Sequence, residues 1–180
     1  VDLCKARPGE VSFGSSGAGA AQHLALELFK LKAGVRATHV PYRGSAPLLA
    51  DLSGDHVDLS FETMTSVAPF AHGGKLVPIA QTRDKRASSF PSVPTMMEAG
   101  VPGYEATTWY GLVAPSSMPA DLVARVNETV NTVLKRPDIR TKLQGYGAED
   151  GGGTPQSFGA FIRKEREKWA TVIRDGKVTV

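Results

Sequence analysis

The sequence has little cysteine, few aromatic residues and no strong excess of charge of either sign. Its 180 residues include one cysteine, Cys4, which excludes an internal disulfide and a multi-cysteine metal site. A formal net charge of +3 with scattered basic residues argues against a nucleic-acid partner, because such a partner needs a basic stripe with stacking aromatics. No apolar run approaches the ~18 residues of a membrane-spanning helix. The four histidines lie on separate predicted elements, so we expect no metal site and no cofactor.

The chain begins Val1-Asp2-Leu3, with neither a methionine nor a signal peptide. We interpret this start as the middle of a helix and expect a fragment or a processed product. The absence of a signal therefore says little about localisation.

Strand-like and helix-like segments alternate through the first two thirds of the sequence. Strands are expected at 11–13, 38–42, 57–61 and 76–80, and helices at 21–33, 46–52 and 66–71. This alternation with short connections predicts an α/β fold with a mainly parallel sheet.

The character of the chain changes at residues 90–104, which are rich in proline and glycine. We expect a crossing between two lobes here, with a short helix at 96–99. A fifth strand is expected at 111–114, followed by helices that start near Pro119, Pro137 and Pro155. The last helix carries an apolar stripe that predicts core packing, made of Phe158, Phe161, Ile162, Trp169, Val172 and Ile173.

Residues 13–23, FGSSGAGAAQH, are the most informative stretch for function. A dinucleotide loop needs a third glycine where Gln22 stands, and a Walker-type phosphate loop needs a lysine that is missing here. A nucleophile elbow around Ser16 fits better, although Ala18 replaces its final glycine. No acid and histidine stand out as triad partners, so a serine hydrolase with Ser16 as nucleophile is the alternative hypothesis.

An anion-binding site requires fewer specific residues than a nucleotide loop or a catalytic triad. A helix that begins near Ala18 leaves its first N–H groups unpaired, with partial positive charge at that end. Small residues let a carboxylate or phosphate approach these groups, and the hydroxyls of Ser15 and Ser16 add donors. His23, one turn into the helix, either faces the loop or packs beneath it.

Polar side chains also follow the next two predicted strands. Tyr42 and Arg43 stand at the end of the second strand, and Glu62 stands just past the third. Tyr42 offers a hydroxyl, Arg43 can hold an anion, and Glu62 can receive an amino or hydroxyl group. Because ligands bind beyond the carboxyl ends of parallel strands, we expect these groups to face one cleft with the serine loop.

Several ordered segments together resemble the Bug or TctC-like family, the periplasmic solute-binding proteins of tripartite tricarboxylate transporters. These are FGSSGAGAAQHLALELFKLKAGV, HVPYRGSAPLLADLSGDHVDLSFE, GKLVPIAQT, FPSVPTMMEAGVPGYEATTWYGLVAP and GGTPQSFGAFIRKEREKW. The resemblance covers nearly the whole chain. It implies a two-lobed periplasmic-binding-protein-like (type II) fold that closes on a small carboxylate, without enzymatic activity or cofactor.

By this resemblance the chain lacks the family's N-terminal stretch. Residues 1–104 would form the complete second lobe, and residues 105–180 the returning strand and C-terminal helices of the first. The partners implied are a small carboxylate, such as a di- or tricarboxylate, an acidic amino acid or an aromatic acid, and the integral membrane subunits of the transporter. The implied location is the periplasm, and the implied state is a monomer when the N-terminal stretch is present.

The resemblance also implies ligand contacts, which fall on Ser15, Ser16, Gly17, Gly19, Ala20, His23, Tyr42, Arg43 and Glu62. Ala20 stands where relatives often carry serine or threonine, so one donor is lost. Glu62 stands where the family usually has an aspartate, and its extra methylene is expected to alter which ligand fits.

Overall fold

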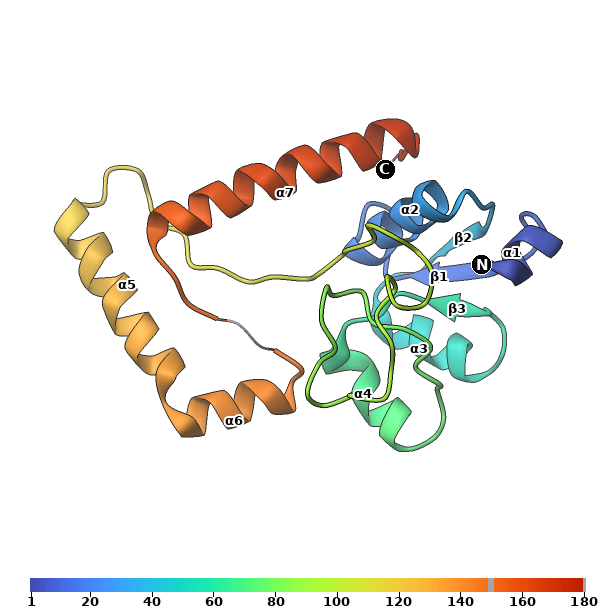
Figure 1. Cartoon of the computed structure of the whole chain (residues 1–180), viewed down its shortest axis with the longest axis horizontal. Coiled ribbons are helices and arrows are strands. Elements are labelled where there is room, and N and C mark those ends of the chain that lie inside the picture. The colour runs from blue at the N-terminus through green and yellow to red at the C-terminus, as the bar shows by residue number, and fades with distance from the viewer. Residues whose placement is uncertain (149–150, 180) are drawn as a thin grey trace.

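The computed structural model describes residues 1–148 and 151–179 (Figure 1). Its first part contains α1 (Asp2–Ala6), β1 (Ser12–Ser15), α2 (Ala21–Ala33), β2 (Thr38–Pro41), α3 (Ser45–Ser53), β3 (Leu59–Ser60) and α4 (Met64–His72). Its second part contains α5 (Ala120–Lys135), α6 (Pro137–Gly145) and α7 (Pro155–Asp175). The α/β alternation of the first part is as predicted.

The three strands form one parallel sheet in the order β2-β1-β3, as expected. The central strand β1 is buried, and Phe13 pairs with His39 on one side and Leu59 on the other. Gly14 is needed here, because a Cβ at this position would lie 2.2 Å from the Leu48 side chain of α3. Since the strands are parallel, the loops after β1, β2 and β3 leave the same edge of the sheet.

Aromatic rings from distant parts of the chain form much of the core. Phe13, Phe29 and Phe61 have ring centroids 5.7–6.0 Å apart, and Phe61 stacks on Tyr104 at 5.9 Å. Tyr104 is fully buried, and its hydroxyl donates to Ala25 O in α2 at 3.0 Å. The proline- and glycine-rich crossing is thereby fixed to the sheet by a large buried side chain.

The strand expected at 76–80 is absent. Val77 and Ile79 are 82% and 64% exposed, and Pro78 has no N–H to give to a ladder. An isolated parallel bridge joins Gln81 to Thr95 instead. The helix expected at 96–99 is also wrong, since that segment is a turn.

The strand expected at 111–114 is likewise absent from the described residues. The segment from 105 to 115 runs extended across the molecule from the α/β body, and a turn at 116–118 leads into α5 (Figure 1). Leu112 and Val113 are 72% and 86% exposed, because no described strand lies beside them. A short apolar run forms a strand only where a neighbour completes the ladder.

The last helix returns from the α5 end of the molecule to the α/β body, where it lies along α2 (Figure 1). Val172 is buried in the main core and Trp169 packs against it, which confirms part of the predicted stripe. Phe158 and Phe161 pack instead against Trp109 of the extended segment, while Ile173 is 43% exposed. Among the described residues, no helix is both long and apolar enough to cross a membrane.

Candidate anion-binding site

The connection from β1 to α2, residues 16–20, is named the anion loop below. Its turn is closed by Ala20 N–H, which donates to Gly17 O at 3.2 Å, and Gly19 takes a left-handed φ of 75°. The expected helix start near Ala18 is therefore wrong, and α2 begins at Ala21.

The first turn of α2 still offers free backbone donors. Ala20 occupies the cap position and supplies no side-chain hydrogen bond. The N–H groups of Ala21, Gln22 and His23 have no intrahelical acceptor, and the helix dipole places partial positive charge there. A carboxylate is the kind of group that such an end stabilises.

Ser15, the last residue of β1, and Ser16, the first residue of the anion loop, have different surroundings. Ser15 is 1% exposed, and its Oγ lies 2.9 Å from Gly17 O and 2.6 Å from His39 Nε2. Ser16 is half-buried, and its hydroxyl donates to Gln22 Oε1 at 2.9 Å. Ser15 therefore stabilises the loop from within, and a contact between Ser15 and a ligand stays a prediction.

Gln22 links the loop to the end of β3. It accepts from Ser16 and donates through Nε2 to Glu62 Oε1 at 3.3 Å, while only 8% exposed. The structure thus brings Ser16 and Glu62 together, as the sequence predicts. We did not identify Gln22 as a site residue from sequence; an amide on the buried face of an amphipathic helix is the signal that could have found it.

Glu62 is a half-buried carboxyl at the end of β3. Its burial raises its pKa above the usual value, while bonds from Thr63 N–H, Ser45 and Gln22 partly oppose this. Thr63 N–H donates to Oε2 at 3.1 Å. A carboxyl with a raised pKa beside free N–H groups can accept from a ligand when ionised and donate to one when protonated.

Tyr42 and Arg43 lie at the end of β2. Tyr42 donates its hydroxyl to Asp51 Oδ2 of α3 at 2.9 Å, and burial together with this carboxylate raises its pKa. The adjacent Gly44 N–H donates to Ser16 O at 3.0 Å, which places this turn against the anion loop. Arg43 is exposed and has no salt-bridge partner within the described part of the chain.

His23 lies beneath the loop, as one of the two sequence interpretations has it. Gly19 N–H donates to its Nδ1 at 3.0 Å, and its Nε2 lies 3.6 Å from Glu27 Oε1. Its ring stacks on that of His39, with centroids 3.7 Å apart. Burial lowers the pKa of both histidines, to about 4 for His39. Sequence reasoning did not identify His39 as a residue of the anion site.

The arrangement does not support the hydrolase hypothesis. The hydroxyl of Ser16 bonds an amide and no histidine. Ser15 contacts His39, but it is buried, and within residues 1–148 and 151–179 no carboxylate is hydrogen-bonded to His39. A nucleophile, a base and an orienting acid are therefore not assembled.

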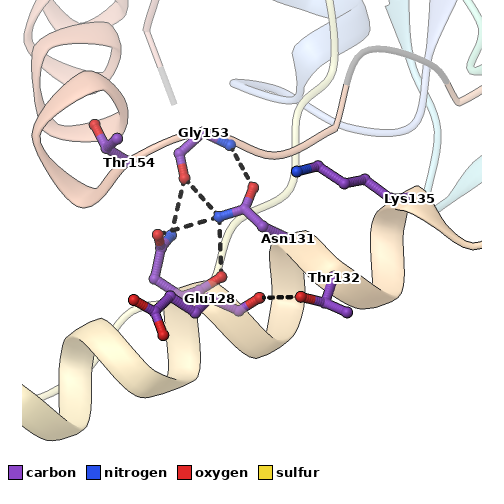
Figure 2. Close-up of a pocket in the computed structure, with 7 residues that line it drawn as sticks. Glu128, Asn131, Thr132, Lys135, Gly153 and Thr154 are labelled. Atoms are coloured by element: carbon purple, nitrogen blue, oxygen red, sulfur yellow. Dashed lines mark hydrogen bonds between the residues drawn. The ribbon is translucent and has the colours of Figure 1, made fainter.

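A separate pocket of about 520 Å³ lies between α5 and the turn at 153–154 (Figure 2). Asn131 accepts from Gly153 N–H at 2.8 Å and donates to Gly153 O at 2.8 Å, and Asn127 donates to the same carbonyl. Figure 2 shows Asn131 and Gly153 facing one another. Because the amides satisfy the turn, they are not free to hold a ligand. No group of three or more possible metal-ligating side chains occurs among the described residues.

Comparisons with known proteins agree with the resemblance. A family model described as the tripartite tricarboxylate transporter family receptor, TctC, matches residues 1–178. BugT of Bordetella pertussis is 35% identical over 175 residues, which are 97% of this chain and 54% of that protein. The chain spans about half the length of curated relatives such as this one.

Solved structures match over nearly all of the chain. An R. palustris protein solved with adipate is 37% identical with a TM-score of 0.87, and the match covers 99% of this chain and 60% of that chain. The periplasmic binding protein BugD is 29% identical with a TM-score of 0.81, and the match covers 98% of this chain and 60% of that chain. MatC from Rhodopseudomonas palustris with bound malate is 26% identical with a TM-score of 0.77, and the match covers 96% of this chain and 60% of that chain. Over the part that it spans, the chain has the α/β fold of these binding proteins.

Proposed function

The chain belongs to the tripartite tricarboxylate transporter receptor family, and from this premise we propose that it captures a small carboxylate outside the cytoplasm for a membrane transporter. The observation that carries the proposal is the anion loop. It presents the free N–H groups of the first turn of α2, beside the Ser16 hydroxyl, at the carboxyl edge of a parallel sheet. Such an end holds an anion by hydrogen bonds and dipole without reacting with it.

The ligand class we propose is a dicarboxylate. Related structures were solved with adipate and with malate, at 37% and 26% identity. One carboxylate would lie on the N–H groups of Ala21, Gln22 and His23. Arg43 adds an exposed cation beside the loop. Glu62 is linked to the loop by Gln22, which donates to its carboxylate. Glu62 would then discriminate between ligands by whether they bring a hydroxyl or amino group to its side of the site.

Two lobes and a membrane partner complete the proposal. Residues 1–104 would act as one lobe, and residues 105–180 would belong to the other except for the C-terminal end of α7, which packs on α2 and into the core of the first. The place where the lobes move would be the crossing near Tyr104 to Tyr110. Integral membrane subunits would then receive the ligand on lobe closure. The periplasm is the compartment named for the related BugD.

Calorimetry tests the proposal. The chain is titrated with adipate, malate and citrate, and with adipamide as an uncharged match for adipate. We expect a dicarboxylate to bind and adipamide to give no heat of binding. Ser16→Ala removes the hydroxyl that bonds Gln22 in the first turn of α2, and it should weaken dicarboxylate binding about two- to tenfold, the value of one hydrogen bond.

The matched control is Ser53→Ala, which removes an exposed hydroxyl at the far end of α3. It should leave affinity unchanged. If no carboxylate binds, or if both serine variants reduce affinity equally, the assignment of the anion loop is wrong.

A further inference from the structure

His23 and His39 come from different elements but act on the same loop. His23 lies in α2 and is 7% exposed, and His39 lies in β2. Their rings are nearly parallel, at 9°, with centroids 3.7 Å apart. The stack therefore joins the first turn of the helix to the edge strand, directly below residues 15–20.

His23 bonds directly to the backbone of the loop, and His39 reaches it through the side chain of Ser15, the last residue of β1. His23 Nδ1 accepts Gly19 N–H at 3.0 Å, and His39 Nε2 lies 2.6 Å from Ser15 Oγ. Ser15 Oγ in turn donates to Gly17 O at 2.9 Å and accepts from Gly17 N–H at 3.3 Å. The pair thus holds the loop at two points, Gly17 and Gly19, on either side of Ala18.

We propose that His23 and His39 are the positioning residues of the anion loop, which they hold in its binding conformation before a ligand arrives. The inference rests on the proposed function, because the loop matters only if it binds an anion. Neither ring needs to touch the ligand. His39 acts through Ser15, and His23 acts through the Gly19 amide.

The bonding pattern defines the protonation state that this role requires. His23 Nδ1 accepts an N–H, so its proton stands on Nε2, which faces Glu27 Oε1 at 3.6 Å. Glu27 is 4% exposed and also pairs with Lys30 at 2.7 Å. A second proton on His23 would turn Nδ1 into a donor against Gly19 N–H. Two charged rings in this stack would also repel each other.

The tautomer of His23 in the unaltered chain is the first test. A long-range ¹H–¹⁵N spectrum of the imidazoles at pH 7.5 should show His23 neutral with its proton on Nε2. A proton on Nδ1, or a charged ring, would overturn the proposal, because either state removes the acceptor of Gly19 N–H. This measurement needs neither a variant nor a carboxylate.

Variants provide the second test. His23→Phe keeps a ring for the stack but removes the acceptor, and the solvent-exchange rate of the Gly19 amide should rise about two- to tenfold, the value of one hydrogen bond. His39→Phe should raise the solvent-exchange rate of the Gly17 amide in the same way. The matched control is His56→Phe, since the side chain of His56 is 72% exposed. Unchanged rates in both His23→Phe and His39→Phe would contradict the positioning role.

A double variant separates positioning from general packing. If His39 acts through Ser15, then His39→Phe should weaken adipate binding in the parent but add no further loss to Ser15→Ala. Additive losses would overturn the proposal for His39. Should adipate fail to bind the parent chain, the proposed function fails, while the tautomer and the exchange rates still decide whether the two histidines hold the loop.

Discussion

At the scale of single residues, adjacent positions in the anion loop have different tasks. Ser15 and Ser16 are indistinguishable in sequence, yet Ser15 is buried against His39, whereas the half-buried Ser16 donates to Gln22. Sequence could predict that this serine pair forms part of an anion site. It could not predict the histidine stack, because His39 is 16 positions from His23 (39 − 23) and meets it only when β2 pairs with β1.

The pH dependence of stability follows from the same pair. Burial lowers the pKa of His39 from 6.5 to about 4 and also lowers that of His23, with Glu27 opposing and Lys30 adding to the shift. Between pH 6.5 and 4 these two histidines bind more protons in the unfolded chain than in the folded chain, so their contribution to stability rises with pH, and the raised pKa of Glu62 opposes it in part. The free energy of unfolding should fall as the pH is lowered through this window.

Urea unfolding at pH 7.5, 6.0, 5.0 and 4.5 measures this effect. The decline should be shallower in His39→Phe than in the parent, since one of the two groups has been removed. His56→Phe is the control and should follow the parent. A parent whose stability is flat from pH 6.5 to 4.5 would contradict the assigned neutral state.

At the scale of elements, the first three strands and α2 are well predicted, and the strands expected at 76–80 and 111–114 are not. The strand-like run at 38–42 correctly predicts β2, and the alternating residues 57–61 contain β3. The apolar runs fail at 76–80, where Pro78 interrupts the segment, and at 111–114, where no described strand lies alongside. An apolar run forms a strand of a sheet only when a partner strand completes the ladder.

The backbone of the anion loop yields a prediction at this scale. Gly19 has a φ of 75°, so Gly19→Ala strains the turn. Gly9, with a φ of 84° and no atoms near the position of a Cβ, makes Gly9→Ala the matched control for strain alone. Both variants should lose about 1 kcal/mol of stability.

Only Gly19→Ala should weaken adipate binding, because it alone moves the N–H groups that face the ligand. Urea unfolding and calorimetry on the same samples separate the two effects. Equal affinity in both variants would show that the geometry of this turn does not control binding.

At the scale of the whole molecule, the two ends of the sequence share one core. Cys4 near the start and Val172 in α7 lie in the same buried cluster, along with Tyr104 of the crossing. The sequence predicts an apolar stripe on α7 but contains no local sign of which residues cover it. Its division between α2 and the extended segment follows from the path of the chain (Figure 1).

The packing of α7 on the α/β body is tested by two neighbouring substitutions. Val172 is 3% exposed, and Val172→Ala should lower the free energy of unfolding by about 2 kcal/mol through lost burial and a small cavity. Ile173 is 43% exposed, and Ile173→Ala should cost less than about 1 kcal/mol despite removing more atoms. The reverse order would mean that α7 presents a different face to α2.

The central claim, that the anion loop holds a carboxylate, is tested most directly by following backbone amide shifts during titration with adipate and, separately, with adipamide. The account predicts saturable shifts with adipate at residues 17–23, with smaller ones at Arg43, Gly44 and Glu62, and no such shifts with adipamide. Shifts that are absent from the loop, identical for the two compounds, or centred on Asn131 and Gly153 would contradict it.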